Sequence, residues 1–212
     1  MGYFSPITRP SDEGVIGILA RSDAKGGPIA QLLELSRPGS TFYMCAMGGL
    51  RLKFEGDRIS YRDREVKHIG LLAGGTGIAP MIQIIRAYGH YAKAHPNPET
   101  LPPFQLNLIY AAEEMSDLAY MKILDTVREQ IPRQFRFYVK LNKPPIGWTE
   151  GIGFIDGHDI IRHLVEPSDD VLVVMCGPPV FEMAMRKLLL KIGFSAGQYY
   201  SYAEGDNVAA HL

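Results

Sequence analysis

The most constraining feature of the sequence is a cluster of glycines between an apolar run and a helical pattern. Residues 69–73 lead into Gly74-Gly75-Thr76-Gly77-Ile78-Ala79-Pro80, and helical periodicity follows from Met81. A strand, a glycine turn and a helix in this order present backbone N–H groups and a helix N-terminus to a phosphate. The dinucleotide fingerprint G-x-G-x-x-G would need a third glycine where Pro80 stands. The turn is therefore either a nucleotide loop of another kind or an ordinary strand-to-helix turn.

The composition indicates a globular chain and excludes several classes of protein. Hydrophobic residues make up 46% and charged residues 21%, and the formal net charge of −1 offers nothing to attract nucleic acid or an anionic membrane. No stretch approaches the ~20 apolar residues of a membrane span, and the N-terminus is not a signal peptide. Two cysteines far apart, Cys45 and Cys176, favour a reducing compartment over a disulfide framework. We therefore expect neither a nucleic-acid partner nor membrane contact from this segment.

From His68 onward strands and helices alternate, which is typical of a parallel sheet with helices on its faces. The predicted strands are 69–73, 105–112, 135–141, 171–175 and 198–202, and the predicted helices start near 81, 117, 156 and 180. Ligands of such sheets bind beyond the carboxyl ends of the strands, where the strand order reverses. The glycine–proline turns at 74–80 and 176–179 both fall at that edge, so their placement favours a nucleotide site over two ordinary turns.

The first sixty residues have a different character, mainly β. Strands are predicted at 15–20, 41–46 and 50–54, around a short helix at 29–35. The turn Lys25-Gly26-Gly27-Pro28 opens that helix and is either an anion site or a plain turn. The predicted organisation is a domain at 1–60, a charged linker at 61–67, a second domain at 68–202 and a tail at 203–212.

Two motifs make the sequence recognisable. The turn at 74–81 and Met175-Cys176-Gly177-Pro178-Pro179 together resemble the NADH domain of cytochrome b5 reductase, a member of the ferredoxin–NADP reductase-like flavoenzymes. The resemblance implies an α/β fold, with a C-terminal Rossmann-like parallel sheet preceded by a partial antiparallel β-barrel of the FAD domain, and implies FAD and NAD as cofactors. It assigns catalytic roles to Cys176, beside the nicotinamide, and to Thr76, near the flavin. The nucleotide-binding residues it implies are Gly74, Gly75, Thr76, Gly77, Ile78, Pro80, Cys176, Gly177, Pro178 and Pro179.

The flavin half of the resemblance departs from the family pattern. Tyr3-Phe4-Ser5-Pro6 is similar to the motif R-x-Y-[ST]-P, with Phe4 at the tyrosine and Gly2 at the arginine. The turn at 26–30 is similar to G-x-M-S, with Ala30 in place of the serine, and 46–49 aligns with G-P-x-G. The flavin-binding residues implied are Phe4, Ser5, Pro6, Gly27, Pro28, Ile29 and Ala30. Because no early barrel strands precede the first motif, we expect an N-terminally truncated FAD domain.

Acidic residues follow the predicted strand at 105–112. Glu113 and Glu114 either form a solvated strand end or bind the adenosine ribose. In the second case their carboxylates would repel a 2′-phosphate and so favour NADH over NADPH. By resemblance, Asp117 corresponds to an aspartate of the adenosine-side loop. No histidine or aspartate pattern supports Cys176 as a nucleophile, and the six histidines lack the spacing of metal ligands, so we expect no metal.

The resemblance predicts an NADH-dependent flavoprotein oxidoreductase. A hydride would pass from NADH to FAD, and single electrons would then pass to a haem protein, either cytochrome b5 or a fused haem domain. Two alternatives remain open: a truncated homologue that binds pyridine nucleotide with weak or no flavin and is not an independent enzyme, or the C-terminal fragment of a larger multidomain reductase. The expected location is the cytosol or the cytoplasmic face of an organelle membrane, with any anchor preceding Met1.

Overall fold

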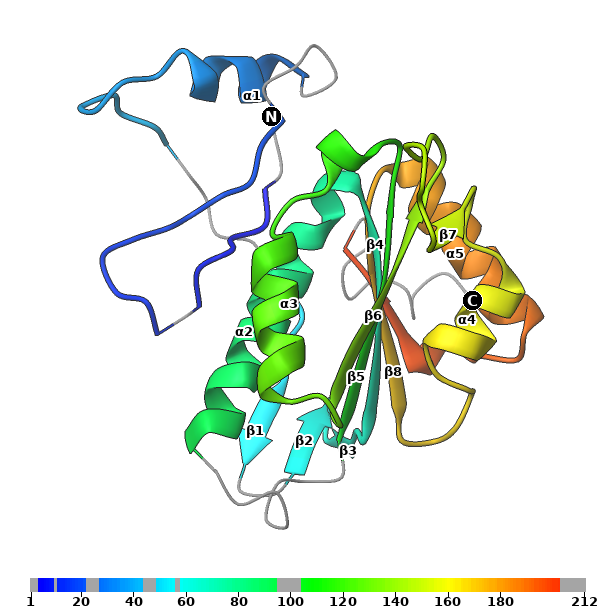
Figure 1. Ribbon diagram of the computed structural model, residues 1–212. Coiled ribbons are helices and arrows are strands. Elements are labelled where there is room, and N and C mark those ends of the chain that lie inside the picture. The colour runs from blue at the N-terminus through cyan, green and yellow to red at the C-terminus, as the bar shows by residue number, and fades with distance from the viewer. Residues whose placement is uncertain are drawn as a thin grey trace.

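A parallel β-sheet forms the centre of the molecule (Figure 1). The computed structural model describes residues 4–9, 11–21, 27–43, 49–55, 58–94 and 104–202. Within these residues the sheet has six strands in the order β7-β6-β5-β4-β8-β9, and every neighbouring pair is parallel. The strands are β4 (His68–Gly74), β5 (Gln105–Ala112), β6 (Phe135–Leu141), β7 (Gly151–Ile152), β8 (Val171–Cys176) and β9 (Tyr199–Ser201). This confirms the predicted α/β class.

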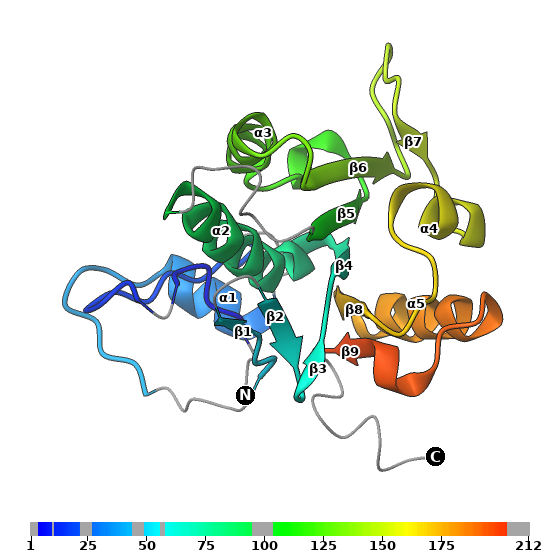
Figure 2. The same ribbon diagram turned by 90° about the horizontal axis from the view of Figure 1, so that it is seen from below.

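Helices cover both faces of this sheet, which explains why β8 is apolar along its whole length and β4 is apolar after His68. In β4, Leu71 and Ala73 belong to one buried cluster and Leu72 to another, because successive side chains point to opposite faces. The first cluster packs under α2 and α3, and the second under α4 and α5. Figures 1 and 2 show these two pairs of helices on opposite faces of the sheet. The helices are α2 (Ile78–Ala94), α3 (Met121–Gln130), α4 (Gly157–His163) and α5 (Pro179–Lys191).

A small antiparallel sheet precedes the parallel one. It consists of β1 (Lys53–Glu55), β2 (Arg58–Tyr61) and β3 (Arg64–Glu65). Ile59 and Val66 are each 2% exposed and join the cluster under α2. The stretch predicted as a linker, 61–67, thus contains the end of β2, a turn and β3, and it packs on the core. The charged residues that suggested a linker, Arg62 and Asp63, form the turn between the two strands. The domain boundary itself remains a prediction.

The N-terminal segment has little regular structure and lies against α2. The strand predicted at 15–20 is wrong: an isolated bridge between Pro6 and Ile18 is the β-pairing recorded there. Residues 41–43 are not a strand either, and 44–46 fall outside the described residues. A short apolar run needs partner strands to stay extended, and Val15 and Ile16 are each 63% exposed. The short helix is confirmed as α1 (Gly27–Glu34).

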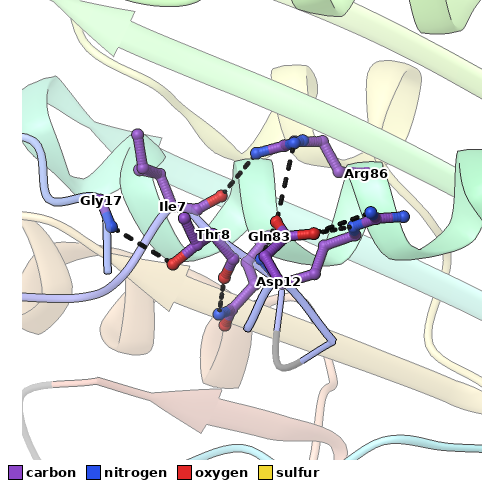
Figure 3. A network of polar contacts seen from close by, with 7 residues as sticks. Ile7, Thr8, Asp12, Gly17, Gln83 and Arg86 are labelled. Carbon is purple, nitrogen blue, oxygen red and sulfur yellow. Dashed lines mark hydrogen bonds and ion pairs between the residues drawn. The ribbon is translucent and has the colours of Figure 1, made fainter. Parts of the chain in front are cut away.

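Side chains of α2 hold this segment by its backbone (Figure 3). The Gln83 amide donates to the carbonyl oxygen of Thr8 at 2.6 Å, and the Arg86 guanidinium donates to the carbonyl oxygen of Ile7 at 3.0 Å. Arg86 also lies 3.9 Å from the Asp12 carboxylate. These contacts fix the segment on the outer face of α2, although it contributes few side chains to the core.

Two helices begin three or four residues from their predicted starts. Helix α2 begins at Ile78, three residues earlier, directly after a 3-10 turn at Gly75–Gly77. Helix α3 begins at Met121 rather than near 117, because a 3-10 turn, Met115–Asp117, and the left-handed Tyr120 (φ 62°) come first. None of the helices in the described ranges combines the length and apolar character needed to cross a bilayer.

Candidate functional site

The two glycine–proline turns meet at the point where the strand order reverses. Strand β4 is the first strand of the parallel sheet along the chain, and it lies between β5 and β8. Ala73 of β4 is in register with Cys176 of β8. A Cβ atom on Gly77 would lie 2.1 Å from the Cys176 carbonyl oxygen and 2.7 Å from the Gly177 nitrogen. Backbone therefore packs directly on backbone, and only glycine fits between β4 and β8 at this level. This is the position where open α/β sheets bind ligands.

The first turn carries backbone donors toward this edge. Gly75 has a φ of 55°, in the left-handed region that favours glycine, and Thr76 is exposed at the tip of the turn. Helix α2 follows at once, with Ile78 and Pro80 buried in its first turn. Since the first N–H groups of a helix have no intrahelical partner, Pro80 stands where its missing N–H costs no hydrogen bond. A glycine turn followed directly by a helix N-terminus is an arrangement suited to an anionic group.

The second turn is shaped by an aromatic ring. Phe181 in α5 lies beside both turns: a Cβ on Gly177 would come within 2.5 Å of its ring, and one on Gly74 within 3.0 Å. Cys176 is half-buried, and Pro178 and Pro179 are exposed. Burial, followed by the nearby Glu182 carboxylate, raises the pKa of the Cys176 thiol to about 12, against a smaller lowering by the Gly177 amide. A neutral thiol is a poor nucleophile, so this chemistry suits a contact residue.

Acidic side chains lie beyond the adjacent strand β5, and two of them, Glu113 and Asp117, have a basic neighbour. Glu113 accepts from Lys143 Nζ at 2.9 Å and from Asn142 Nδ2 at 2.9 Å. The same hydrogen bond and charge raise the pKa of the exposed Lys143. Asp117 pairs with Arg21 of the N-terminal segment at 2.8 Å, and Glu114 is exposed. Gly74 is in register with Ala111, so these acids share the edge of the sheet with the glycine turn.

The residues predicted to bind flavin come from two separate parts of the N-terminal segment. Phe4, Ser5 and Pro6 lie beside the stretch docked on α2, with Phe4 and Ser5 half-buried. Gly27 (φ 73°), Pro28, Ile29 and Ala30 lie in the first turn of α1, which stands apart from the parallel sheet in Figure 1, and Ala30 is 3% exposed. Gly2, Tyr3 and 44–48 fall outside the described residues. The structure thus brings the two turns predicted to bind the nucleotide together. The residues predicted to bind flavin come from two separate stretches of the chain.

Comparison with known proteins agrees with this geometry. The family model for the oxidoreductase NAD-binding domain matches residues 71–187. NADH-cytochrome b5 reductase 2 of Xenopus laevis is 36% identical over 216 residues, covering 94% of this chain and 70% of that protein. The chain belongs to the NADH-cytochrome b5 reductase family. The predicted resemblance is therefore confirmed.

Two further similarities extend the comparison. NADH-cytochrome b5 reductase 1 of Dictyostelium discoideum is 32% identical, and the chain spans 63% of its length, with 94% of the chain aligned. The crystal structure of the cytochrome b5 reductase domain of Ulva prolifera nitrate reductase is 25% identical, with a TM-score of 0.77, covering 94% of this chain and 78% of that one. The similarity therefore includes the N-terminal segment as well as the parallel sheet.

Sequence reasoning missed three residues that shape the site. Phe181 fills the space beside both glycine turns, and Glu182 and Ser201 are buried polar residues behind the second turn. The run Pro179-Val180-Phe181-Glu182 predicts the start of a helix, but nothing in the local sequence indicates that the Glu182 carboxylate is buried. No group of histidine, cysteine or acidic residues suited to a metal occurs among the residues that the structure describes.

Proposed function

We propose that this chain is an NADH-dependent oxidoreductase that binds the nucleotide across the edge of β4 and β8. The observation that carries the proposal is the backbone contact of Gly77 with Cys176 and Gly177, which joins a phosphate-type turn to a cysteine-containing turn at the switch point of the sheet. Family membership supports the same assignment. The pyrophosphate would rest on Gly75–Gly77 and the N-terminus of α2.

Each remaining residue of the set has a role in this proposal. Cys176, a neutral and half-buried thiol, and Gly177 would contact the nicotinamide ring, and Thr76 at the tip of its turn would border the flavin. Glu113, Glu114 and Asp117 would lie at the adenosine end, where a carboxylate favours the ribose of NADH over a 2′-phosphate. FAD, when bound, supplies the hydride acceptor and the source of single electrons. The proposed acceptor is a haem protein such as cytochrome b5, and the proposed location is the cytosol or the cytoplasmic face of a membrane.

A second candidate is a nucleotide-binding homologue, or a piece of a larger reductase, that holds flavin weakly. This candidate is favoured by the low burial of the N-terminal segment. Among its described residues between 4 and 43, Ala30 is the single apolar side chain that is buried. Leu35 is 79% and Tyr43 101% exposed there, so the described residues of this half form no core of their own. Ala30 also offers no hydroxyl to a phosphate, and Gly2 offers no guanidinium, so charge-assisted contacts are missing from this sequence.

An absorbance spectrum of the purified chain, with and without added FAD, separates the two candidates. Weak flavin retention together with NADH binding by titration calorimetry would favour the second candidate. A stoichiometric flavin band that NADH bleaches under anaerobic conditions would favour the complete reductase, and cytochrome b5 reduction would then test the acceptor. Absence of NADH binding would overturn both candidates.

A further inference from the structure

A buried carboxylate lies directly behind the second turn. Glu182, in the first turn of α5, is 5% exposed, and Ser201, the last residue of β9, is 2% exposed. In the described part of the chain the other buried polar side chains are Lys140 and Asp159, which pair with each other at 2.5 Å. Buried polar groups destabilise a fold unless they are hydrogen-bonded, so the partners of Glu182 indicate what it holds in place.

The two oxygens of Glu182 bind different segments. Oε1 accepts the backbone N–H of Gly177 at 3.2 Å, and Oε2 accepts the hydroxyl of Ser201. Gly177 follows Cys176 in the turn that contacts Gly77. One side chain therefore connects α5, the Cys176–Gly177 turn and the last strand of the sheet.

Cys176 precedes Gly177 and Tyr202 follows Ser201, and the side chains of these two neighbours lie on the opposite face of the sheet from Glu182. Cys176 and Tyr202 both pack against the cluster under α2. Tyr202 donates its amide to the Met175 carbonyl at 3.1 Å, and its ring meets that of Tyr200 edge-on, with centroids 5.1 Å apart. Burial raises the pKa of the Tyr202 hydroxyl, and Cys176 is one of the nearby groups that add to this effect. Because side chains alternate along a strand, holding Ser201 from the α5 side also fixes Tyr202 on the α2 side.

We propose that Glu182, anchored by Ser201, is a positioning residue for the nicotinamide end of the bound nucleotide. The inference rests on the proposed function, which places the nicotinamide at the Cys176–Gly177 turn. Hydrogen bonds to a carboxylate are shorter and stronger than those between neutral groups, so they hold the Gly177 backbone in one position. The hydrogen bonds of Glu182 run to Gly177 and Ser201, whereas Glu113, beyond β5, is held by Asn142 and Lys143, so the effect of Glu182 should be largest at the nicotinamide end.

Two mild variants of the full chain test this role, Glu182→Gln and Ser201→Ala. The glutamine keeps an oxygen for the Gly177 amide and removes the charge, and the alanine removes only the hydroxyl. Calorimetry with NADH and with ADP-ribose, which lacks the nicotinamide, compares the two ends of the site. We expect the Kd for NADH to rise about fivefold in each variant, while the Kd for ADP-ribose stays within about twofold of the wild-type value.

Matched controls are Glu129→Gln and Ser168→Ala. Glu129 is exposed in α3, and the exposed Ser168 donates to Asp170 Oδ1 at 2.5 Å, so each control removes the same group away from the site. Thermal unfolding confirms that every variant is folded. Equal weakening of both ligands would indicate a general structural role and overturn the proposal, as would an unchanged Kd for NADH. If the wild-type chain bound neither ligand, the proposed function itself would fail.

The thiol provides a second readout that needs no nucleotide. Glu182 contributes to the raised pKa of Cys176, so Glu182→Gln should move the pH profile of Cys176 alkylation to lower pH. Mass spectrometry of the Cys176 peptide distinguishes it from Cys45. An unshifted profile would show that the carboxylate does not act on this turn.

Discussion

Replacing Gly77 with alanine should damage both the fold and the nucleotide site. The added Cβ would lie 2.1 Å from the Cys176 carbonyl oxygen, 2.4 Å from its carbonyl carbon and 2.7 Å from the Gly177 nitrogen. These three neighbours are backbone atoms at the end of a buried strand, so no side-chain rotation can relieve the contact. The two turns must separate instead, by about 1 Å to restore an ordinary non-bonded distance.

The expected magnitude follows from the cost of overpacking. Forcing extra atoms into a packed interior destabilises by about 1–3 kcal/mol, which for a chain of this size lowers Tm by roughly 2–12 °C. The effect on the ligand should be larger, because the pyrophosphate turn and the Cys176–Gly177 turn then no longer lie in register. We expect the Kd for NADH to rise at least about tenfold, since the loss of one or two hydrogen bonds to a charged pyrophosphate costs about 1.4 kcal/mol or more.

Two other glycines provide controls for Gly77→Ala. A Cβ on Gly89, within α2, would sit 3.6 Å from Val127, an ordinary contact, so Gly89→Ala should be neutral or raise stability by up to about 1 kcal/mol. Gly75→Ala meets no atom within 4 Å but strains a φ of 55°, at about 1–2 kcal/mol. Calorimetry and thermal unfolding measure both quantities. A Gly77→Ala protein with wild-type Tm and wild-type NADH affinity would refute the reasoning.

Three further predictions concern other parts of the molecule. The chain should bind NADH more tightly than NADPH, and neutralising Glu113 and Glu114 to glutamine should narrow the difference about tenfold by calorimetry; equal affinities in the wild type would contradict this. Lys140→Met should lower the free energy of unfolding in urea by about 3–5 kcal/mol, because it leaves the buried Asp159 carboxylate without its cation, and a loss below about 1 kcal/mol would contradict this. Arg86→Ala should accelerate proteolysis within the first twenty residues while NADH affinity is kept, because the guanidinium holds that segment by its backbone; an unchanged cleavage rate would argue against the docking.

The parts of the structure that the sequence predicted correctly are specified by neighbouring residues. Strand β4, its glycine turn and α2 follow from an apolar run, a glycine cluster and a proline in the first helical turn. The same kind of signal predicts β8, the Cys176–Pro179 turn and α5. Periodicity and turn chemistry are properties of short windows, and they were sufficient for the fold class and for the placement of both turns.

The parts that failed depend on residues distant in the sequence. The contact of Gly77 with Cys176 and the bond of Glu182 to Ser201 arise only when the sheet assembles, so no window contains them. The predicted strand at 15–20 had the right composition but no partner strand to complete it. The stretch predicted as a linker shows the converse: its charged residues form a two-residue turn between strands that pack on the core, while the domain boundary remains a prediction.

The attachments of the N-terminal segment determine how the two cofactor sites depend on each other. This segment is tied to the parallel-sheet domain by polar contacts, Gln83 and Arg86 of α2 on its backbone and Arg21 on Asp117, rather than by a core of its own. The two turns of the proposed nucleotide site lie between β4 and α2 and between β8 and α5, elements whose side chains fill two buried clusters. Local opening of the segment therefore costs less free energy than opening of the sheet. It follows that flavin affinity can be lost while NADH affinity is kept, whereas loss of the sheet would remove the support of both sites.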